Sequence, residues 1–215
     1  MRILILLLCV FPVYADYICE VHESDSQCAA RYGQDNVVYI EDVFKFSSGS
    51  GVRISDSLVI TAAHVTEKMM PLFDGLEPEY HIESNEGIDI SLYRVEFREE
   101  SEYADIIEKM PTLGTVVYAL GYPGAIDYTM TSGYWMGSSV EGEPYTGYHS
   151  AQIYPGSSGG ALVMVVQGKR FREVKLVGLT NWGAATDRGM TTMGWVLKGT
   201  YILEFLEEIN DQADR

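Results

Sequence analysis

Short apolar runs recur along this chain at intervals of about ten residues, and turn-forming residues separate them. Runs of this length bounded by Gly, Pro, Asn, Asp or Ser predict β-strands, and their close spacing is typical of a sandwich or barrel. The 215 residues, with 47% hydrophobic and 21% charged, can bury a core in one domain or two tightly joined halves. We therefore predict an all-β chain.

The pattern also locates the individual elements. Strands are expected at 37–40, 43–46, 52–54, 58–61, 87–95, 116–120, 128–136, 148–153, 161–166, 173–179 and 193–197. Segment 66–87 predicts a loop around one strand, and the acidic segment 99–110 predicts a connection with room for one helical turn. A helix is expected only at 200–212, where Ile202, Phe205, Leu206 and Ile209 share one face.

The first fifteen residues differ from the rest. Arg2 is followed by an apolar run at 3–12 and by the small Ala15, a pattern that predicts a secretory signal peptide too short to span a bilayer. The alternative is a buried first strand. Leu8 directly before Cys9 argues against a lipoprotein site. We expect a secreted or periplasmic mature chain, 16–215, with no membrane insertion after the signal is removed.

The net charge and the cysteines indicate which binding partners and metal ions to exclude. The net charge of −16 argues against nucleic acid and anionic membranes, which need cationic patches. In an exported chain the pair Cys19 and Cys28 predicts one disulfide near the mature N-terminus. Two thiols with only His22 between them are too few ligands for zinc, so we expect no metal and no cofactor.

The stretch 154–162 carries the strongest chemical signal. Ser158 lies among Gly156, Gly159 and Gly160, and residues without Cβ allow backbone N–H groups to converge in a tight turn. A serine hydroxyl needs a base to remove its proton and donors to hold the oxyanion that its attack creates. We predict that the N–H groups of Gly156 and Ser158 form the oxyanion hole.

Two upstream motifs contain partners for this serine. The sequence TAAH at 61–64 places His64 just after a β-run, on a short turn or single helical turn. In GIDISL at 87–92, Asp89 begins a strand and faces away from the aliphatic residues, where a charge must be solvated or paired. Asp105 is the alternative acid.

Together TAAH, GIDISL and GSSGGAL resemble the chymotrypsin-like (trypsin-like, PA clan) serine proteases, and their order matches that family. GSG at 49–51, ALGYPG at 119–124 and LTNWG at 179–183 extend the resemblance over nearly the whole mature chain. It implies two six-stranded antiparallel β-barrels, at about 36–110 and 111–199, and a C-terminal helix at 200–212. It also implies that His64 is general base and acid, Asp89 orients it, and Ser158 attacks the scissile carbonyl.

Departures from the family indicate the nearest members. No IVGG sequence follows a basic residue near the N-terminus, and Ser157 replaces the aspartate that pairs with a freed N-terminus in pancreatic-type members. We expect no activation by such cleavage. The chain looks closest to bacterial HtrA-type and glutamyl endopeptidase-type members, without a PDZ domain, since the segment after Ser158 suits only a second barrel.

The resemblance also suggests substrate contacts. It places Gln152 at the base of the primary pocket, where a neutral side chain would not attract Lys or Arg. Asn181, Trp182 and Gly183 resemble the segment that pairs with substrate backbone as an added strand. His149 would reach the pocket and favour acidic side chains.

We therefore expect a monomeric, secreted serine endopeptidase that acts on proteins or peptides through an acyl-enzyme. An inactive relative that has become a binding module is the alternative, although such a module needs no complete set of His64, Asp89, Ser158 and Gly156. Hydrolysis of an ester would use the same residues.

Overall fold

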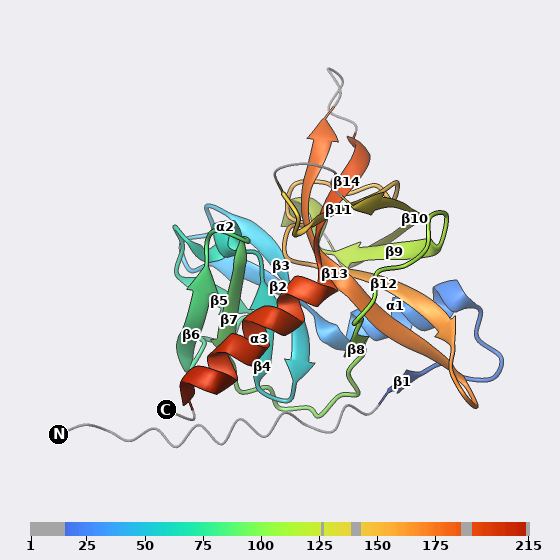
Figure 1. Cartoon of the computed structure of the whole chain (residues 1–215). Helices are drawn as coiled ribbons and strands as arrows, with labels where there is room; N and C mark the ends of the chain where they lie inside the picture. Colours follow the sequence, from blue (N-terminus) through green and yellow to red (C-terminus); the bar gives the residue numbers. More distant parts are fainter. Residues whose placement is uncertain (1–15, 126, 139–142, 186–190, 214–215) are drawn as a thin grey trace.

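The computed structural model describes residues 16–125, 127–138, 143–185 and 191–213, in two β-sheet halves with helices around them (Figure 1). The predicted signal peptide at 1–15 lies outside the described residues. No described helix has the length and apolar character that crossing a membrane requires.

The second half is a closed barrel of six strands. Antiparallel pairing runs through β13, β12, β9, β10, β11 and β14 and returns to β13. Its strands are β9 (Val116–Gly121), β10 (Thr129–Ser138), β11 (Thr146–His149), β12 (Ala161–Gln167), β13 (Arg172–Ala185) and β14 (Thr191–Lys198). Two short strands, β1 (Tyr17–Ile18) and β8 (Asp105–Ile106), extend this sheet from β13. A 3-10 turn, η1 (Pro123–Ala125), follows β9.

The first half is a six-stranded sheet that curls into a half-barrel. Its strand order is β5, β2, β3, β4, β7, β6, with every neighbouring pair antiparallel. The strands are β2 (Val37–Asp42), β3 (Ser48–Ser55), β4 (Leu58–Thr61), β5 (Pro71–Phe73), β6 (Tyr80–Asn85) and β7 (Ile90–Arg94). With the C-terminal helix, the two halves confirm the expected chymotrypsin-like fold.

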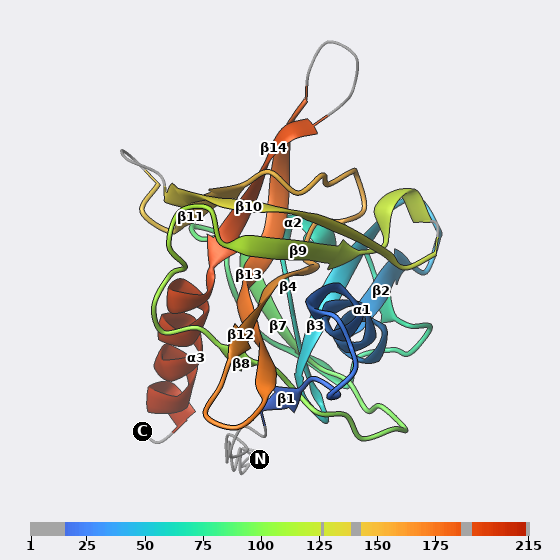
Figure 2. The same ribbon diagram turned by 90° about the vertical axis from the view of Figure 1, so that its right-hand side faces the viewer.

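The C-terminal helix α3 (Gly199–Ala213) begins where β14 ends and extends beside the first half (Figures 1 and 2). Ile202, Phe205 and Leu206 are buried, as their helical spacing predicted. Phe205 and Ile209 also line a surface hollow together with residues 83–86 of β6 and the segment after it. The helix therefore contacts both halves.

The N-terminal segment contains a helix, α1 (Asp25–Asn36), that the sequence analysis missed. Ser24 and Gln27 form a capping box: the Ser24 hydroxyl accepts from the Gln27 N–H at 3.2 Å, and the Gln27 side chain accepts from the Ser24 N–H at 2.8 Å. The apolar side of α1 is short because most of its residues are polar, so apolar periodicity gave little signal. The S-x-x-Q pattern at 24–27 was the available clue.

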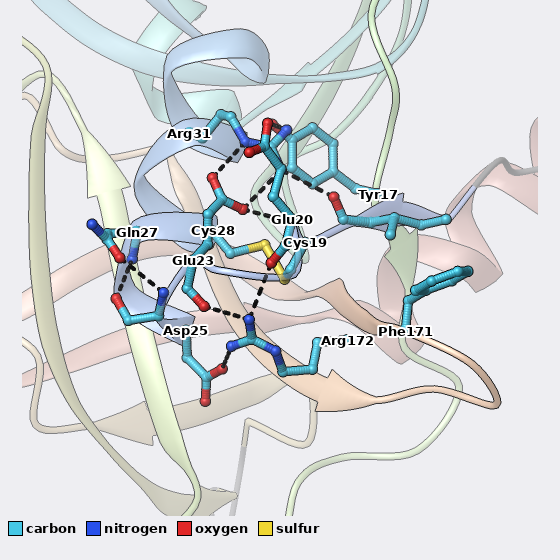
Figure 3. Close-up of a disulfide and its surroundings, with 12 residues drawn as sticks. Tyr17, Cys19, Glu20, Glu23, Asp25, Gln27, Cys28, Arg31, Phe171 and Arg172 are labelled. Carbon is cyan, nitrogen blue, oxygen red and sulfur yellow. Dashed lines mark hydrogen bonds and ion pairs between the residues drawn. A yellow bond between two sulfur atoms is a disulfide. The ribbon is translucent and has the colours of Figure 1, made fainter.

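The predicted disulfide is present, and it joins Cys19 to Cys28 on the buried side of α1 (Figure 3). Two arginines hold the same segment. Arg31 donates to Glu23 at 2.8 Å and to the Tyr17 hydroxyl at 2.8 Å, whereas Arg172, at the start of β13, donates to Asp25 at 2.6 Å and to the Glu23 carbonyl. The segment is thereby attached to the closed barrel.

Several local expectations were wrong. Segment 43–46, expected as a strand, forms the turn between β2 and β3, and the strand expected at 148–153 is β11, which ends at His149. Segment 66–87 contains two strands, β5 and β6, instead of one. Segment 99–110 has no helical turn; it runs extended and contributes β8, which pairs in parallel with β13. Asp89 does not begin a strand, because its φ of 60° is left-handed and β7 starts only at Ile90.

Candidate active site

His64 lies on the short helix α2 (Ala63–Thr66), directly after β4, as the sequence predicted. Asp89 Oδ2 lies 2.7 Å from His64 Nδ1, and Asp89 Oδ1 accepts from the His64 backbone N–H at 2.9 Å. A carboxylate at Nδ1 favours the tautomer that carries its proton there, which puts the lone pair on Nε2. Asp89 thus binds the imidazole through one carboxylate oxygen and the His64 backbone through the other.

The register of two paired strands brings these residues together. Thr61 at the end of β4 is paired with Ser91 of β7, so α2 follows one strand at the point where Asp89 precedes the other. The left-handed turn at Asp89 directs its carboxylate to α2 rather than along β7. The alternative acid, Asp105, lies in β8 and accepts from Lys175 at 2.7 Å. The structure places Asp89, and not Asp105, against His64.

Residues 154–160, here called the nucleophile loop, form a turn in which the carbonyls of residues 154–158 accept hydrogen bonds from other parts of the turn or the fold. The Pro155 carbonyl accepts from the Gly124 N–H at 2.6 Å, and the Ser157 carbonyl accepts from the Gly160 N–H at 3.0 Å. Thr180 Oγ1 also donates to the Ser157 carbonyl, at 2.5 Å. These contacts fix the orientation of the peptide planes on both sides of Gly156 and Ser158.

The fixed carbonyls orient two N–H groups. In a planar trans peptide the N–H points opposite to the preceding carbonyl, so the N–H groups of Gly156 and Ser158 point away from Gly124 and Thr180. Neither N–H donates a hydrogen bond to any residue that the structure describes. Gly156 has φ of 96°, which a residue with Cβ rarely adopts. Both N–H groups are therefore available to donate to a bound ligand.

The nucleophile loop packs against the strand that leads to His64. A Cβ at Gly159 would overlap the Ser50 carbonyl and the Thr61 hydroxyl, and it would lie 3.0 Å from the Ala62 nitrogen. Glycine is therefore required at 159 for the two halves to approach each other. Gly159 follows Ser158, and Ala62 precedes His64 by two positions. Their contact therefore brings the two chain segments that carry Ser158 and His64 together.

The Ser158 hydroxyl donates to the Asn181 carbonyl at 2.7 Å. Asn181, Trp182 and Gly183 belong to the outer part of β13, beyond Thr180, whose N–H donates to the Gly160 carbonyl at 2.8 Å. In this substrate-free arrangement the hydroxyl proton is directed to β13. The serine and the proposed substrate-pairing segment are thus direct neighbours.

The residues suggested for specificity lie in different environments. Gln152 is exposed, and its Oε1 accepts from the Tyr154 hydroxyl at 3.2 Å. His149 is fully buried in β11, where its ring lies over Gly194 of β14. Burial lowers the pKa of His149 to about 4, although a nearby Ala151 backbone group favours the charged ring. The ring is therefore neutral at neutral pH.

One residue of the site was not singled out by the sequence analysis. Ser50 of β3 contacts the nucleophile loop through its backbone N–H and its hydroxyl. The only signal was the GSG sequence at 49–51, which does not show what the serine side chain contacts. Among the described residues, no group of three or more His, Cys, Asp or Glu side chains is arranged to hold a metal.

The closed barrel, the curled half-barrel and the helix after them define a chymotrypsin-like serine endopeptidase. Residues 49–171 match the model of the trypsin-like peptidase domain, so the chain belongs to that family. No curated protein matches the sequence significantly.

Solved structures show the same fold. A serine endoprotease from Yersinia pestis is 24% identical with a TM-score of 0.70, and the match covers 88% of this chain and 68% of that one. The protein Rv3671c from Mycobacterium tuberculosis, in an inactive serine-to-alanine mutant form, is 21% identical with a TM-score of 0.67. That match covers 94% of this chain and 98% of the other.

Proposed function

We propose that this endopeptidase cleaves peptide bonds through an acyl-enzyme formed on Ser158, with His64 as general base and acid. The observation that carries the proposal is the pair of contacts from Asp89 to His64: Oδ2 lies 2.7 Å from the ring Nδ1, and Oδ1 accepts from the backbone N–H at 2.9 Å. The contact of Asp89 Oδ2 with Nδ1 orients the ring and stabilises the imidazolium that forms when Nε2 takes a proton. A histidine with only a structural role does not need a carboxylate that contacts both its ring and its backbone.

The chemical steps follow from these positions. The Ser158 hydroxyl leaves the Asn181 carbonyl and gives its proton to His64 Nε2 while Oγ bonds to the substrate carbonyl carbon. The N–H groups of Gly156 and Ser158 donate to the resulting oxyanion. His64 then returns the proton to the leaving amine as the C–N bond breaks, and water attacks the ester by the same route to release the acid.

Asn181 to Gly183 would hold the substrate backbone as a strand added to β13. A substrate N–H that donates to the Asn181 carbonyl would replace the Ser158 hydroxyl there, which frees the hydroxyl to approach His64. For the side chain before the cleaved bond, the neutral Gln152 and the neutral, buried His149 provide no charge that selects Lys, Arg or acidic residues. We propose a preference for neutral residues.

Labelling with a fluorophosphonate probe tests the nucleophile. Wild-type protein should be labelled, Ser158→Ala should not, and the adjacent Ser157→Ala should still be labelled at 158. Turnover by Ser158→Ala should fall on the order of 10⁶-fold, as for other triad serines. An unlabelled, folded wild-type protein would instead support a binding module, in which the Ser158 hydroxyl stays on the Asn181 carbonyl.

Cleavage of a peptide library by residues 16–215 tests specificity. Cuts should follow neutral residues. Dominant cutting after Arg or Lys would show that Gln152 does not contact the side chain before the cleaved bond.

We also propose that the protein acts outside the cytoplasm. The signal-peptide pattern at 1–15 and the disulfide between Cys19 and Cys28 support this location, because disulfides persist in oxidising compartments. Expression of the full chain in a bacterium, followed by cell fractionation and N-terminal sequencing, should give a protein that starts at Asp16. A cytosolic protein that keeps Met1 would contradict the proposal.

A further inference from the structure

We propose that Ser50 is a positioning residue for the reaction, and that its hydroxyl holds the nucleophile loop in the conformation that presents the oxyanion hole. This inference rests on the proposed function. Ser50 lies in β3 of the first half and is fully buried. Its hydrogen bonds cross from the half that contributes His64 to the half that contributes Ser158.

Both polar functions of the Ser50 hydroxyl are used. Oγ donates to the Gly156 carbonyl at 2.8 Å and accepts from the Tyr122 N–H at 2.9 Å. The Ser50 backbone N–H also donates to the Ser158 carbonyl at 2.9 Å. One residue thus binds the carbonyls of both residues whose amides form the proposed oxyanion hole.

The Ser50 backbone is itself held. Its carbonyl accepts from the Thr61 hydroxyl at 2.7 Å, and β3 is paired with β2 and β4 on its two sides. Packing leaves little space for another arrangement, since a Cβ at Gly160 would lie 3.2 Å from Ser50 Cβ. The anchor is therefore part of a rigid strand.

The hydroxyl acts where the loop is most flexible. Between the two donor amides the chain turns at the φ and ψ angles of Gly156 and Ser157, and glycine restricts its own dihedrals least. The hydrogen bond from Ser50 fixes the Gly156 carbonyl and hence the orientation of the peptide plane between Gly156 and Ser157. Without it, the amides of Gly156 and Ser158 can turn relative to each other and no longer converge on one oxygen.

Within the described residues, no charged side chain holds the nucleophile loop in this conformation. Ser157 accepts from the Tyr154 N–H at 3.3 Å, and Asp16, at the start of the described chain, binds Lys175 of β13 at 2.6 Å. A hydroxyl does not titrate near neutral pH, so the anchor holds the loop without cleavage of the chain and without dependence on pH.

Acylation by p-nitrophenyl acetate across a pH series tests the inference on the full mature chain. Because a single oxyanion donor contributes about 100- to 1000-fold, we expect Ser50→Ala to lower the plateau rate by about 10- to 100-fold. The midpoint of the pH profile should stay unchanged, because Ser50 does not contact His64 or Asp89. Burst amplitude counts the competent molecules, so partial unfolding does not lower the measured rate constant.

Ser48→Ala is the matched control: it lies on the same face of β3, and its hydroxyl makes no hydrogen bond to a described residue. It should keep the wild-type rate. Ser50→Gly also lacks the hydroxyl, so its plateau rate is measured instead if Ser50→Ala does not fold. An unchanged plateau in a folded Ser50 variant, even with a lower melting temperature, overturns the inference, and so does a shifted midpoint. A wild-type protein without a burst contradicts the proposed function instead.

Discussion

At the scale of single residues, the site depends on how Asp89 holds His64. Asn at 89 would keep the shape, but its amide can donate to Nδ1 and so favour the tautomer with the proton on Nε2. We expect Asp89→Asn to lower the acylation rate on the order of 10⁴-fold with little loss of stability. Asp105→Asn, which affects only the Lys175 cluster, should keep the rate; a larger effect there would assign the role to the wrong acid.

His149 gives a residue-scale prediction about pH and stability. Its folded-state pKa of about 4 lies below the unfolded value of 6.5, because burial disfavours the charged ring. Between pH 6.5 and pH 4 the His149 ring is therefore protonated in the unfolded chain but not in the folded one. The free energy of unfolding falls as the pH drops through this range. The difference amounts to about 3 kcal/mol.

His149→Phe removes this proton uptake. We expect its urea-unfolding free energy to change less than that of the wild type between pH 7 and pH 4.5, since all other titrating groups are shared. Parallel curves for the two proteins would mean that His149 is charged, or accessible to water, in the folded state.

At the scale of elements, α1 is the part held most by local covalent and ionic contacts. The disulfide joins residues nine apart, and closing a loop of this size is worth about 2–3 kcal/mol in the chain-entropy account. The double variant Cys19→Ser, Cys28→Ser should lose that much unfolding free energy in urea. Its acylation rate should be unchanged, because neither the disulfide nor its arginine contacts reach the nucleophile loop. A large loss of rate would show that α1 supports the site.

The same scale shows what sequence can predict. The strands before His64 and around Ser158 were predictable because strand periodicity and glycine turns are local signals. The helix α1 was missed because most of its residues are polar, so its few buried residues, such as Ala29 and Tyr32, give only a weak periodic signal. The turn at Asp89 was also missed, since its φ of 60° depends on a contact with α2. The bond from Ser50 to Gly156 joins residues 106 apart, and no local pattern records such a contact.

At the scale of the whole molecule, one hydrophobic core continues through both halves. It includes Ile60 and Ile90 of the first half, Leu120 and Leu176 of the second, and Phe205 of α3. The proposed site has residues from both halves, so the proposed reaction requires that the halves stay docked. A shared core predicts that the halves unfold together, because exposing one face removes burial from the other.

The tryptophans make this testable. Trp135, Trp182 and Trp195 all belong to strands of the closed barrel, whereas Ile60 is fully buried in the first half. We expect Ile60→Ala to cost about 2–5 kcal/mol and to move the urea midpoint of tryptophan fluorescence as far as that of far-UV circular dichroism. Separate midpoints, or a fluorescence midpoint that does not respond, would mean that each half unfolds by itself. In that case the hydrogen bonds of Ser50 would break before the barrel that carries Ser158 unfolds.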